Sequence, residues 1–344
     1  MLALIDHPHA RVKLRSERLL VFARRDAGGE GEGGGDAGER KFLRAIPLFN
    51  LDRLVINETV QLTSQALAAL LRRRIPLSLL DWHGHYLGGF HPAAGAESEA
   101  RLQQYRVSEN PALAIGLARR TVRAKLYNER RFLQRLSAHR ADTDFAPEID
   151  RLAARLENAE TAPDVDALRG CEGAGSASFF AAWARCLPPE FPFEHRSARP
   201  PHNPVNACIS YLATLLYHEL VSQLHAHGLD PGLGLLHRTE NGRWSLALDL
   251  LEPFRPCFVE ALTLHLFSHR ILNRDHFEKK HGGIYLNEAG RPLFFAQYEQ
   301  RMQREFFCLH TNCRTTLRRQ LDQQVLTYKA ALTDPDKFAP FRMN

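Results

Sequence analysis

Two acidic residues stand in one of the most apolar stretches of the chain, and this stretch limits what the sequence can fold into. The segment reads Ser245-Leu-Ala-Leu-Asp-Leu-Leu-Glu-Pro-Phe-Arg-Pro256, so Asp249 and Glu252 lie three residues apart. On a helical turn this spacing places both carboxylates on one face. Burying an unpaired carboxylate is costly, so such acids pair with a cation or bind a metal ion. Arg255 is one available partner, and the residues alone leave that ion pair and a metal site equally open.

Two further segments contain residue types that bind hard metal ions. Glu172 stands in Gly170-Cys-Glu-Gly173, and His237 ends Gly232-Leu-Gly-Leu-Leu-His237. Carboxylate oxygens with one imidazole suit Mg²⁺ or Mn²⁺. Taken alone, however, Glu172 is typical of an exposed helix acid and His237 of an ordinary loop histidine. The metal-site hypothesis therefore rests on the combination of these residues with Asp249 and Glu252.

Positive charge is concentrated in one segment of the chain. Between Arg101 and Arg140 there are ten Lys or Arg and two Glu, a local net charge of +8 in a chain whose total is +6. Apolar residues recur there at helical spacing, so we expect a helix with arginines on its other faces. A concentrated basic surface is typical of polyanion binding, but a solvated helix face explains the charge equally well.

Cysteine usage and hydropathy predict a cytoplasmic protein without membrane association. The six cysteines include no C-x-x-C pair and stand mostly among apolar residues, as buried thiols in a reducing compartment do. The first residues lack the basic region and apolar core of a signal peptide, and no run is long enough to span a membrane. Cys308, His310 and Cys313 are a weak zinc candidate, because no fourth ligand is near them in sequence.

The sequence predicts an α+β fold with a small β-rich N-terminal domain, residues 1–92. Short apolar runs with turn-like flanks predict strands at 19–22, 45–49, 54–56 and 76–80. Thr63 or Ser64 is suited to cap a short helix. Half of the residues in 26–39 are glycine, and this segment lacks the Gly-Lys-Ser/Thr ending of a phosphate-binding loop, so we expect a flexible loop.

Beyond a linker at 93–100, the sequence predicts a larger, all-α catalytic domain, residues 101–344. Besides the basic segment, helices are expected at about 148–159, 163–186, 203–226, 256–272 and 292–332. Near the linker, His83, His85 and His91 lie in or beside a turn. They are weak metal-ligand candidates because no acid cluster is near them in sequence.

Four short motifs, taken together, resemble those of a known family, the CRISPR-associated adaptation endonuclease that is the integrase subunit of spacer acquisition. The motifs are Gly170-Cys-Glu-Gly173, Pro204-Val-Asn-Ala207, Gly234-Leu-Leu-His237 and Leu248-Asp-Leu-Leu-Glu-Pro-Phe-Arg-Pro256. Segments similar to the family's N-terminal strands, basic helix and C-terminal part occur at 76–88, 120–128, 273–277 and 282–286. Each motif is weak alone, but their common order makes the resemblance specific over nearly the whole chain.

The resemblance implies a metal-dependent DNA endonuclease and integrase. Glu172, His237 and Glu252 would bind Mg²⁺ or Mn²⁺, with Asp249 supporting the site, and the imidazole ligand favours Mn²⁺. The 3′-hydroxyl of a captured DNA fragment would attack a phosphodiester at the boundary of a CRISPR repeat. The family also implies a homodimer joined through residues 1–92, with a small ferredoxin-like partner subunit completing a heterohexamer.

Some features of the chain depart from the family or leave other functions open. Phe179 stands where many members carry Tyr, and Leu212-Ala213 stands where many carry Gly-Tyr. A stand-alone nuclease acting on branched DNA would use the same site, whereas a non-catalytic DNA-binding scaffold would only pair its acids with arginines. The DNA-binding candidates are Arg119, Arg120, Arg123, Lys125, Arg196, Arg199 and Arg255.

Overall fold

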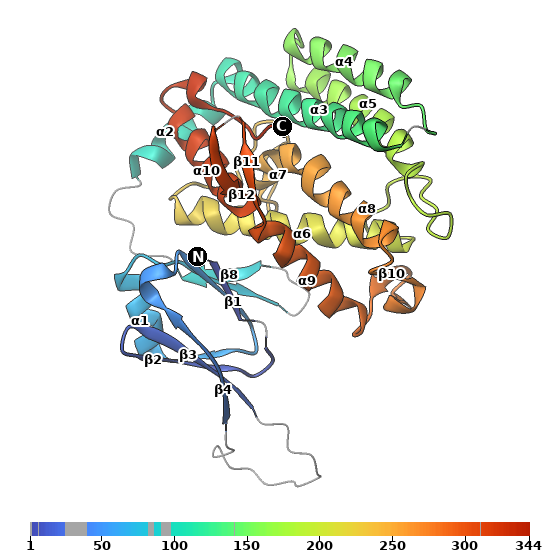
Figure 1. Ribbon diagram of the computed structural model, residues 1–344. Coiled ribbons are helices and arrows are strands. Elements are labelled where there is room, and N and C mark those ends of the chain that lie inside the picture. Colours follow the sequence, from blue (N-terminus) through green and yellow to red (C-terminus); the bar gives the residue numbers. More distant parts are fainter. Residues whose placement is uncertain are drawn as a thin grey trace. The chain divides into compact units, whose positions relative to one another are not determined.

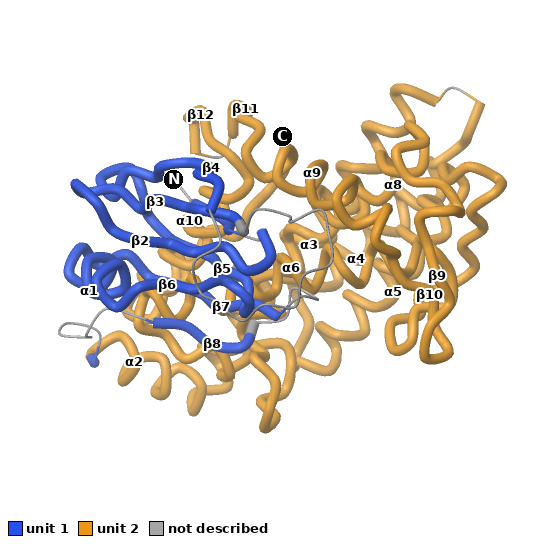
Figure 2. The backbone as a smooth tube through the Cα atoms, turned by 90° about the horizontal axis from the view of Figure 1, so that it is seen from below, with its two compact units in different colours: residues 1–98 blue, residues 99–344 orange. Residues whose placement is uncertain are grey.

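The structure is a computed structural model that describes residues 2–5, 7–24, 40–81, 86–90, 98–140, 142–309 and 311–344. The chain forms two compact units, residues 1–98 and 99–344, which Figure 2 draws in different colours. The boundary between the units falls within the predicted linker at 93–100. The glycine-rich segment 26–39 and the turn histidines His83, His85 and His91 lie outside the described residues.

In its described part, unit 1 contains two four-stranded sheets and a helix (Figure 1). One sheet has the order β1-β5-β7-β8, formed by β1 (Leu2–Ile5), β5 (Arg53–Asn57), β7 (Leu77–Leu80) and β8 (Tyr86–Phe90). The other has the order β4-β3-β2-β6, formed by β2 (Arg11–Arg15), β3 (Arg18–Arg24), β4 (Arg40–Pro47) and β6 (Gln61–Leu62). The side chain of Thr63 caps α1 (Ser64–Arg72), which confirms the predicted cap.

The strands of unit 1 enclose one apolar core. Alternation along β3 buries Leu19 and Val21, and the parallel strands add Leu54 and Leu77. The sequence missed β1 and β2. In β2 the reason is its pattern, Arg11-Val-Lys-Leu-Arg15, in which charged residues separate the few apolar side chains that enter the core.

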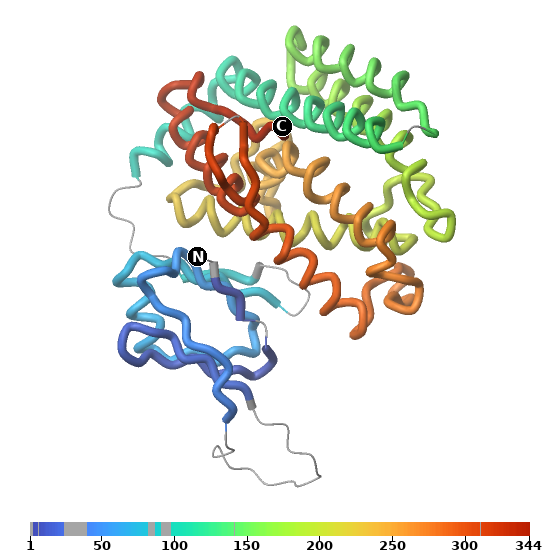
Figure 3. The backbone as a smooth tube through the Cα atoms, viewed as in Figure 1, coloured from blue at the N-terminus to red at the C-terminus, as the bar shows by residue number. Residues whose placement is uncertain are grey.

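Helices dominate unit 2, and Figure 3 traces their succession along the chain. They are α2 (Ser98–Ser108), α3 (Pro111–His139), α4 (Ala146–Glu160), α5 (Val165–Ala184), α6 (Pro204–Ala226), α7 (Ser245–Leu251), α8 (Ala261–Ser268), α9 (Gly290–Gln303) and α10 (Leu317–Ala331). The predicted basic helix is divided into α2 and α3, because Asn110 caps a new helix that starts at Pro111. Among the described residues, no helix has the length and hydropathy that a membrane span requires.

The prediction of an all-α second domain is wrong, because unit 2 also contains two β-hairpins. These are β9 (Phe277–Lys280) with β10 (Gly283–Leu286), and β11 (Glu305–Cys308) with β12 (Cys313–Thr316). The second hairpin interrupts the predicted helix at 292–332. Its strands contain aromatic and β-branched residues, which favour extended structure. Asn312 has a φ of 49° and so provides the left-handed turn between them.

The apolar run with the two acids does not form one regular helix. After α7 the chain makes a 3₁₀ turn over Glu252–Phe254 and a π turn over Arg255–Glu260 before α8 begins. Pro253 and Pro256 explain this change, because neither has the backbone N–H that an α-helix would use. The side-chain amide of Asn128, on α3, donates to the carbonyl of Pro253 at 2.6 Å and so fastens the turn to α3.

We predict opposite effects of two Gly→Ala substitutions on α5. A Cβ at Gly175 would overlap Leu126 of α3, whereas a Cβ at Gly170 would meet no atom within 4 Å. Gly175→Ala should therefore destabilise the protein by about 1–3 kcal/mol through overpacking. Gly170→Ala should instead stabilise it by up to about 1 kcal/mol through helix propensity.

Denaturant unfolding of the two variants measures the difference. Because both substitutions add the same methyl group to the same helix, the Gly170 variant controls for propensity. Equal stabilities of the two variants would show that α3 and α5 are not in close contact at Gly175.

Candidate active site

Asp249 organises the loop that carries His237. It lies on α7, and its side chain is fully buried. One carboxylate oxygen accepts hydrogen bonds from the backbone N–H groups of Leu235 and Leu236 at 2.5 and 3.0 Å. The other accepts from the backbone N–H of His237 at 3.0 Å and from its ring Nδ1 at 2.6 Å. The charge of Asp249 is thus met by four donors within the protein.

The same loop is too tight for a side chain at Gly234. A Cβ there would overlap the carbonyl oxygen of His237 and lie 2.7 Å from the Cβ of Ser245. The glycine of the sequence motif Gly234-Leu-Leu-His237 therefore permits the close packing of the loop on the start of α7. This packing brings the histidine back over Asp249.

His237 has one ring nitrogen committed and one available. Because Nδ1 donates to a carboxylate, Nε2 remains as an acceptor or metal ligand. The side chain is one-third exposed. Burial lowers the pKa of His237, but the hydrogen bond and charge of Asp249, followed by the charges of Glu252 and Glu172, raise it above its ordinary value. The ring therefore lies within the electrostatic field of both glutamates.

Lys125 joins the two predicted metal-binding glutamates. Its ammonium, from α3, donates to Glu172 on α5 and to Glu252 after α7. The side chains of Lys125 and Glu252 are 6% and 9% exposed, and that of Glu172 is 24% exposed. Burial raises the pKa of Glu252, but Lys125 and then Arg255 more than offset it and lower that pKa to about 2. The two glutamates, 80 positions apart in the sequence, thus converge on one cation.

Two further buried acids, missed by the sequence analysis, belong to the same cluster. Glu129 on α3 accepts a hydrogen bond from Ser176 at 2.9 Å through one oxygen, and its Oε2 has no partner among the described residues. Burial raises the pKa of Glu129 to about 8. Neither carboxylate oxygen of Glu260 has a hydrogen-bond partner among the described residues, and the nearest cation, Arg255, lies 3.8 Å away. Burial also raises the pKa of Glu260. Glu260 stands in the apolar run Pro256-Cys-Phe-Val-Glu-Ala-Leu262, so the criterion that selected Asp249 would have found it.

The structure places several predicted DNA contacts inside the protein. Lys125, which was predicted to contact DNA, is instead buried between Glu172 and Glu252 and pairs with both. Arg255 lies 3.9 Å from Glu252 and 3.8 Å from Glu260, which is the ion pairing that the sequence left open. Arg196 donates to the side chains of Asn206 and Ser210 at 2.8 and 3.0 Å, whereas Arg199 is exposed.

The arginines of α3 also have partners within the chain. Arg119 donates to the carbonyl of Ala162 at 3.0 Å, Arg120 contacts Asp336 and Phe338, and Arg123 pairs with Glu160. Arg120 and Arg123 keep about one-third of their side chains exposed. A DNA-binding role for these three arginines stays a prediction.

One of the two positions where many members of the resembling family carry tyrosine, Phe179, belongs to the core of this chain. Phe179 is 1% exposed, and its ring centroid lies 5.9 Å from that of Phe132 and 5.5 Å from that of Phe180, in edge contacts. Ala213, where the other tyrosine would stand, is partly buried and follows the fully buried Leu212. A hydroxyl at position 179 would have to find a partner in an apolar environment, so phenylalanine suits that site.

The types of side chain at the predicted site suit a hard divalent cation, although a lysine stands among them. Within the described ranges, no three His, Cys, Asp or Glu side chains are arranged to hold a metal ion. The Lys125 ammonium lies between Glu172 and Glu252. These carboxylates nevertheless share one cation already, and both influence the ring of His237. Two carboxylates with an imidazole suit Mg²⁺ or Mn²⁺.

The weak zinc candidate gains no support. Cys308 and Cys313 face each other across the β11–β12 hairpin as free thiols, the first buried and the second exposed. His310 lies outside the described residues.

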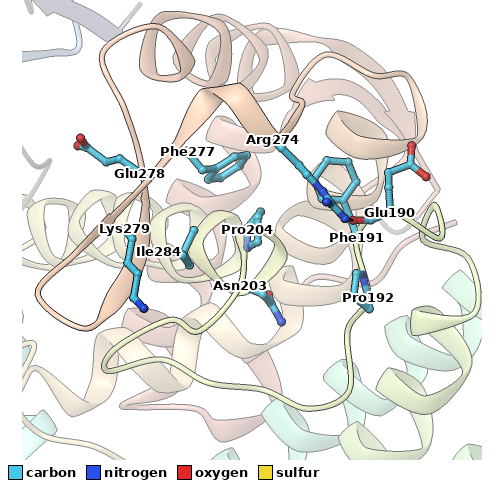
Figure 4. Close-up of a pocket in the computed structure, with 10 residues that line it drawn as sticks. All are labelled: Glu190, Phe191, Pro192, Asn203, Pro204, Arg274, Phe277, Glu278, Lys279 and Ile284. Carbon is cyan, nitrogen blue, oxygen red and sulfur yellow. Dashed lines mark hydrogen bonds between the residues drawn. The ribbon is translucent and has the colours of Figure 1, made fainter.

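A pocket of about 330 Å³ lies elsewhere in unit 2 (Figure 4). Its lining includes Phe191, Phe277 and Ile284, with Arg274 and Lys279 among its charged members. None of the clustered acids lines this pocket, so the pocket is not part of the acid cluster.

Comparisons with known proteins agree on one family. Residues 4–300 match the profile of the family described as "CRISPR associated protein Cas1". Two endonucleases named Cas1 from Thermus thermophilus are similar: one is 34% identical over 76% of this chain and 77% of its own length, the other 33% identical over 96% of both. A solved CAS1 protein from Thermotoga maritima has a TM-score of 0.75, with 26% identity, covering 99% of this chain and 100% of its own.

We predict that Asp249→Asn lowers both the stability of the metal-free protein and the pKa of His237. The amide NH₂ of asparagine would face N–H groups whose hydrogen bonds the carboxylate now accepts. We therefore expect the free energy of unfolding to fall by about 2–4 kcal/mol. A raised histidine pKa adds stability that is complete below the ordinary value of 6.5 and lost as pH rises through the raised value. This pH-dependent part of the stability should disappear in the variant.

Histidine NMR titration and denaturant unfolding in a chelating buffer provide the measurements. Asp322→Asn is the matched control, because Asp322 contacts the ring of His227 at 2.8 Å on the surface. An unchanged His237 pKa in Asp249→Asn would contradict the hydrogen bond described above.

Proposed function

The chain belongs to the Cas1 family of CRISPR-associated proteins, and from this premise we propose a role for each member of the acid cluster. The protein is a nuclease and integrase of CRISPR adaptation, and its family is metal-dependent. We assign Glu172, His237 and Glu252 as the metal ligands and Asp249 as the residue that positions His237. The convergence of two distant glutamates on one cation carries this assignment.

The proposed reaction is transesterification at the boundary of a CRISPR repeat. The 3′-hydroxyl of a captured DNA fragment gives up its proton as its oxygen forms a new bond to phosphorus. The bond from phosphorus to the 3′-oxygen of the attacked strand breaks, and that oxygen takes up a proton and leaves as a 3′-hydroxyl. A bound Mg²⁺ or Mn²⁺ ion would stabilise charge on the phosphate and activate the attacking oxygen. Glu172 and Glu252 would hold this ion with Nε2 of His237, and an imidazole ligand would favour Mn²⁺.

The charges of the cluster support cation binding over the scaffold alternative. A non-catalytic scaffold would pair each buried acid with a cation. Among the described residues, the cluster contains only two such cations, Lys125 and Arg255, for four acids that are buried or nearly so: Glu129, Glu172, Glu252 and Glu260. Burial is the main cause of the raised pKa of both Glu129 and Glu260, and the charges of neighbouring acids add to it. A cation that entered the cluster would offset this cost of burying carboxylates. The stand-alone nuclease would use the same residues, with water as the nucleophile.

The proposed partners are DNA, a second copy of the chain, and a small ferredoxin-like subunit that completes a heterohexamer in the cytoplasm. Unit 1 supports the homodimer, because it exposes large apolar side chains. These include Phe49 at 76%, Phe42 and Leu87 at 52%, and Phe90 at 49%. Such exposure on a soluble domain is typical of a protein interface.

We predict that His237→Ala reduces strand joining more than Asp249→Asn does. The first change removes a proposed ligand. The second should cost about 10–100-fold, as loss of a residue that orients a ligand does, and added Mn²⁺ should rescue it better. The assay joins a fragment with a 3′-hydroxyl to repeat DNA. A fragment with a 2′,3′-dideoxy end, which has no hydroxyl to attack with, is the negative control.

His269→Ala is the control variant, because His269 is an exposed histidine at the end of α8. Circular dichroism verifies that each variant is folded. Wild-type joining rates in both folded site variants would disprove the proposed mechanism. Hydrolysis without any joining by the wild-type protein would instead favour the stand-alone nuclease.

We predict that replacing Arg119, Arg120 and Arg123 together by Ala weakens DNA binding for all sequences and flattens its salt dependence. Phosphate contacts carry little base information, and each one lost removes about one counterion from the salt slope. Affinity is measured on unrelated duplexes over a range of salt concentrations. The control replaces Arg72, Arg73 and Arg74, an exposed run in unit 1 that carries the same charge. Equal slopes for the two triple variants would show that net charge, and not α3, determines the salt dependence.

A further inference from the structure

We propose that Lys125 is a resident counter-ion that competes with the divalent metal for Glu172 and Glu252, and that Glu129 receives its ammonium when metal binds. This inference rests on the proposed metal site and adds to it a lysine and an acid with two alternative pairings. It concerns which carboxylate pairs with Lys125 before and after the metal binds.

The first observation is that Lys125 lies between the two glutamates that are proposed to bind the metal. Its ammonium contacts one oxygen of Glu172 and one of Glu252, and the side chain is almost completely buried. A divalent ion bound to both carboxylates would lie close to that ammonium. Two positive charges that near each other repel strongly where water is excluded. The metal and the ammonium therefore cannot hold both glutamates together.

The second observation is a vacant acceptor next to the lysine. Glu129 lies four residues after Lys125 on α3, so both side chains project from the same face of the helix. Its Oε2 is buried without a hydrogen-bond partner among the described residues. A buried carboxylate oxygen without a partner is costly to retain, which points to a partner in another state of the protein.

The third observation is that the two positions of the ammonium are close together. The hydroxyl of Ser176 lies 2.9 Å from Oε1 of Glu129 and 3.3 Å from Oε1 of Glu172. One serine thus bridges the acid that Lys125 now contacts and the acid that would receive it. We infer that a change of side-chain rotamer carries the ammonium from one acid to the other, because the lysine stem is flexible and both residues stand on α3.

The remaining charges of the cluster do not replace Lys125 in either role. Arg255 lies 3.9 Å from Glu252 and 3.8 Å from Glu260, so it is shared between those acids on its own side of the cluster. Asp249 is satisfied by backbone N–H groups and His237. Glu129 is therefore the buried acid with a free oxygen on the helix of Lys125 itself.

Titration of the metal-free, full-length protein with Mn²⁺, followed by calorimetry without DNA, tests the competition. Lys125→Met keeps the length of the side chain and removes its charge, so Mn²⁺ should bind at least about tenfold more tightly. Lys329→Met is the matched control: it removes one lysine from α10, where Lys329 contacts the carbonyl of His227, and affinity should not change. Equal or weaker binding by Lys125→Met would overturn the inference.

A double-mutant cycle tests the role of Glu129. Glu129→Gln keeps the shape of the side chain but cannot form the carboxylate that receives the ammonium, so Mn²⁺ affinity should fall in the wild-type background. The same substitution should have no effect in Lys125→Met, because no lysine remains to be moved. An equal loss in both backgrounds would show that Glu129 acts on the metal directly or only on folding, and would overturn this part of the inference.

A structure of the wild-type protein with Mn²⁺ needs no variant and applies even where a substitution prevents folding. Lys125 within hydrogen-bonding distance of Glu129 supports the exchange, and Lys125 still between Glu172 and Glu252 overturns it. If neither the wild-type protein nor Lys125→Met binds Mn²⁺, the proposed metal site is wrong and the inference falls with it. If the wild-type protein binds Mn²⁺ and Lys125→Met binds it no more tightly, only the inference fails.

Discussion

The structure of unit 2 depends on the cost of burying carboxylates. Five acids are buried or nearly so around α3, α5 and the segment from α7 to α8, and each must find donors or cations inside the protein. Asp249 finds them in the backbone of one loop, and Glu172 and Glu252 find them in Lys125. Glu129 and Glu260 remain only partly satisfied. The helices are thus held together by the same charges that make the site suited to a divalent ion.

The backbone around Glu252 shows how the sequence accommodates this requirement. In a regular helix through residues 245–268, the backbone carbonyls would accept hydrogen bonds from N–H groups of the same helix. Pro253 and Pro256 interrupt this pattern and leave carbonyls available to other donors. Asn128 uses one of them, and its amide also donates to the carbonyl of Phe341 at 2.9 Å. The ring of Phe341 stacks on Phe254 with centroids 4.9 Å apart. The turn that carries Glu252 is therefore clamped to α3 and to the last residues described.

The sequence predicted the elements whose signals are local, and missed those that depend on distant partners. The cap at Thr63 and the helices α4, α5 and α6 follow from caps and periodicity. The hairpin at 305–316 was missed because its apolar residues also fit a helical period, and only Asn312 indicates the turn. In the site, motif order led to Glu172, His237, Asp249 and Glu252. Lys125 was assigned to the surface because charge counts do not reveal burial, and Glu129 became visible only when α3 was seen to pack on α5.

The four hydrogen bonds to Asp249 also have an entropic consequence. A histidine on a free loop would lose backbone and side-chain freedom when it binds a ligand, and that loss would weaken binding. Here the ring and the three successive N–H groups of residues 235–237 are already fixed by one carboxylate. The ordering takes place during folding, so binding at Nε2 begins from a preorganised ring. At the proposed metal site the glutamates would, by contrast, have to exchange partners, so the carboxylates rather than the histidine would determine the affinity for a metal ion.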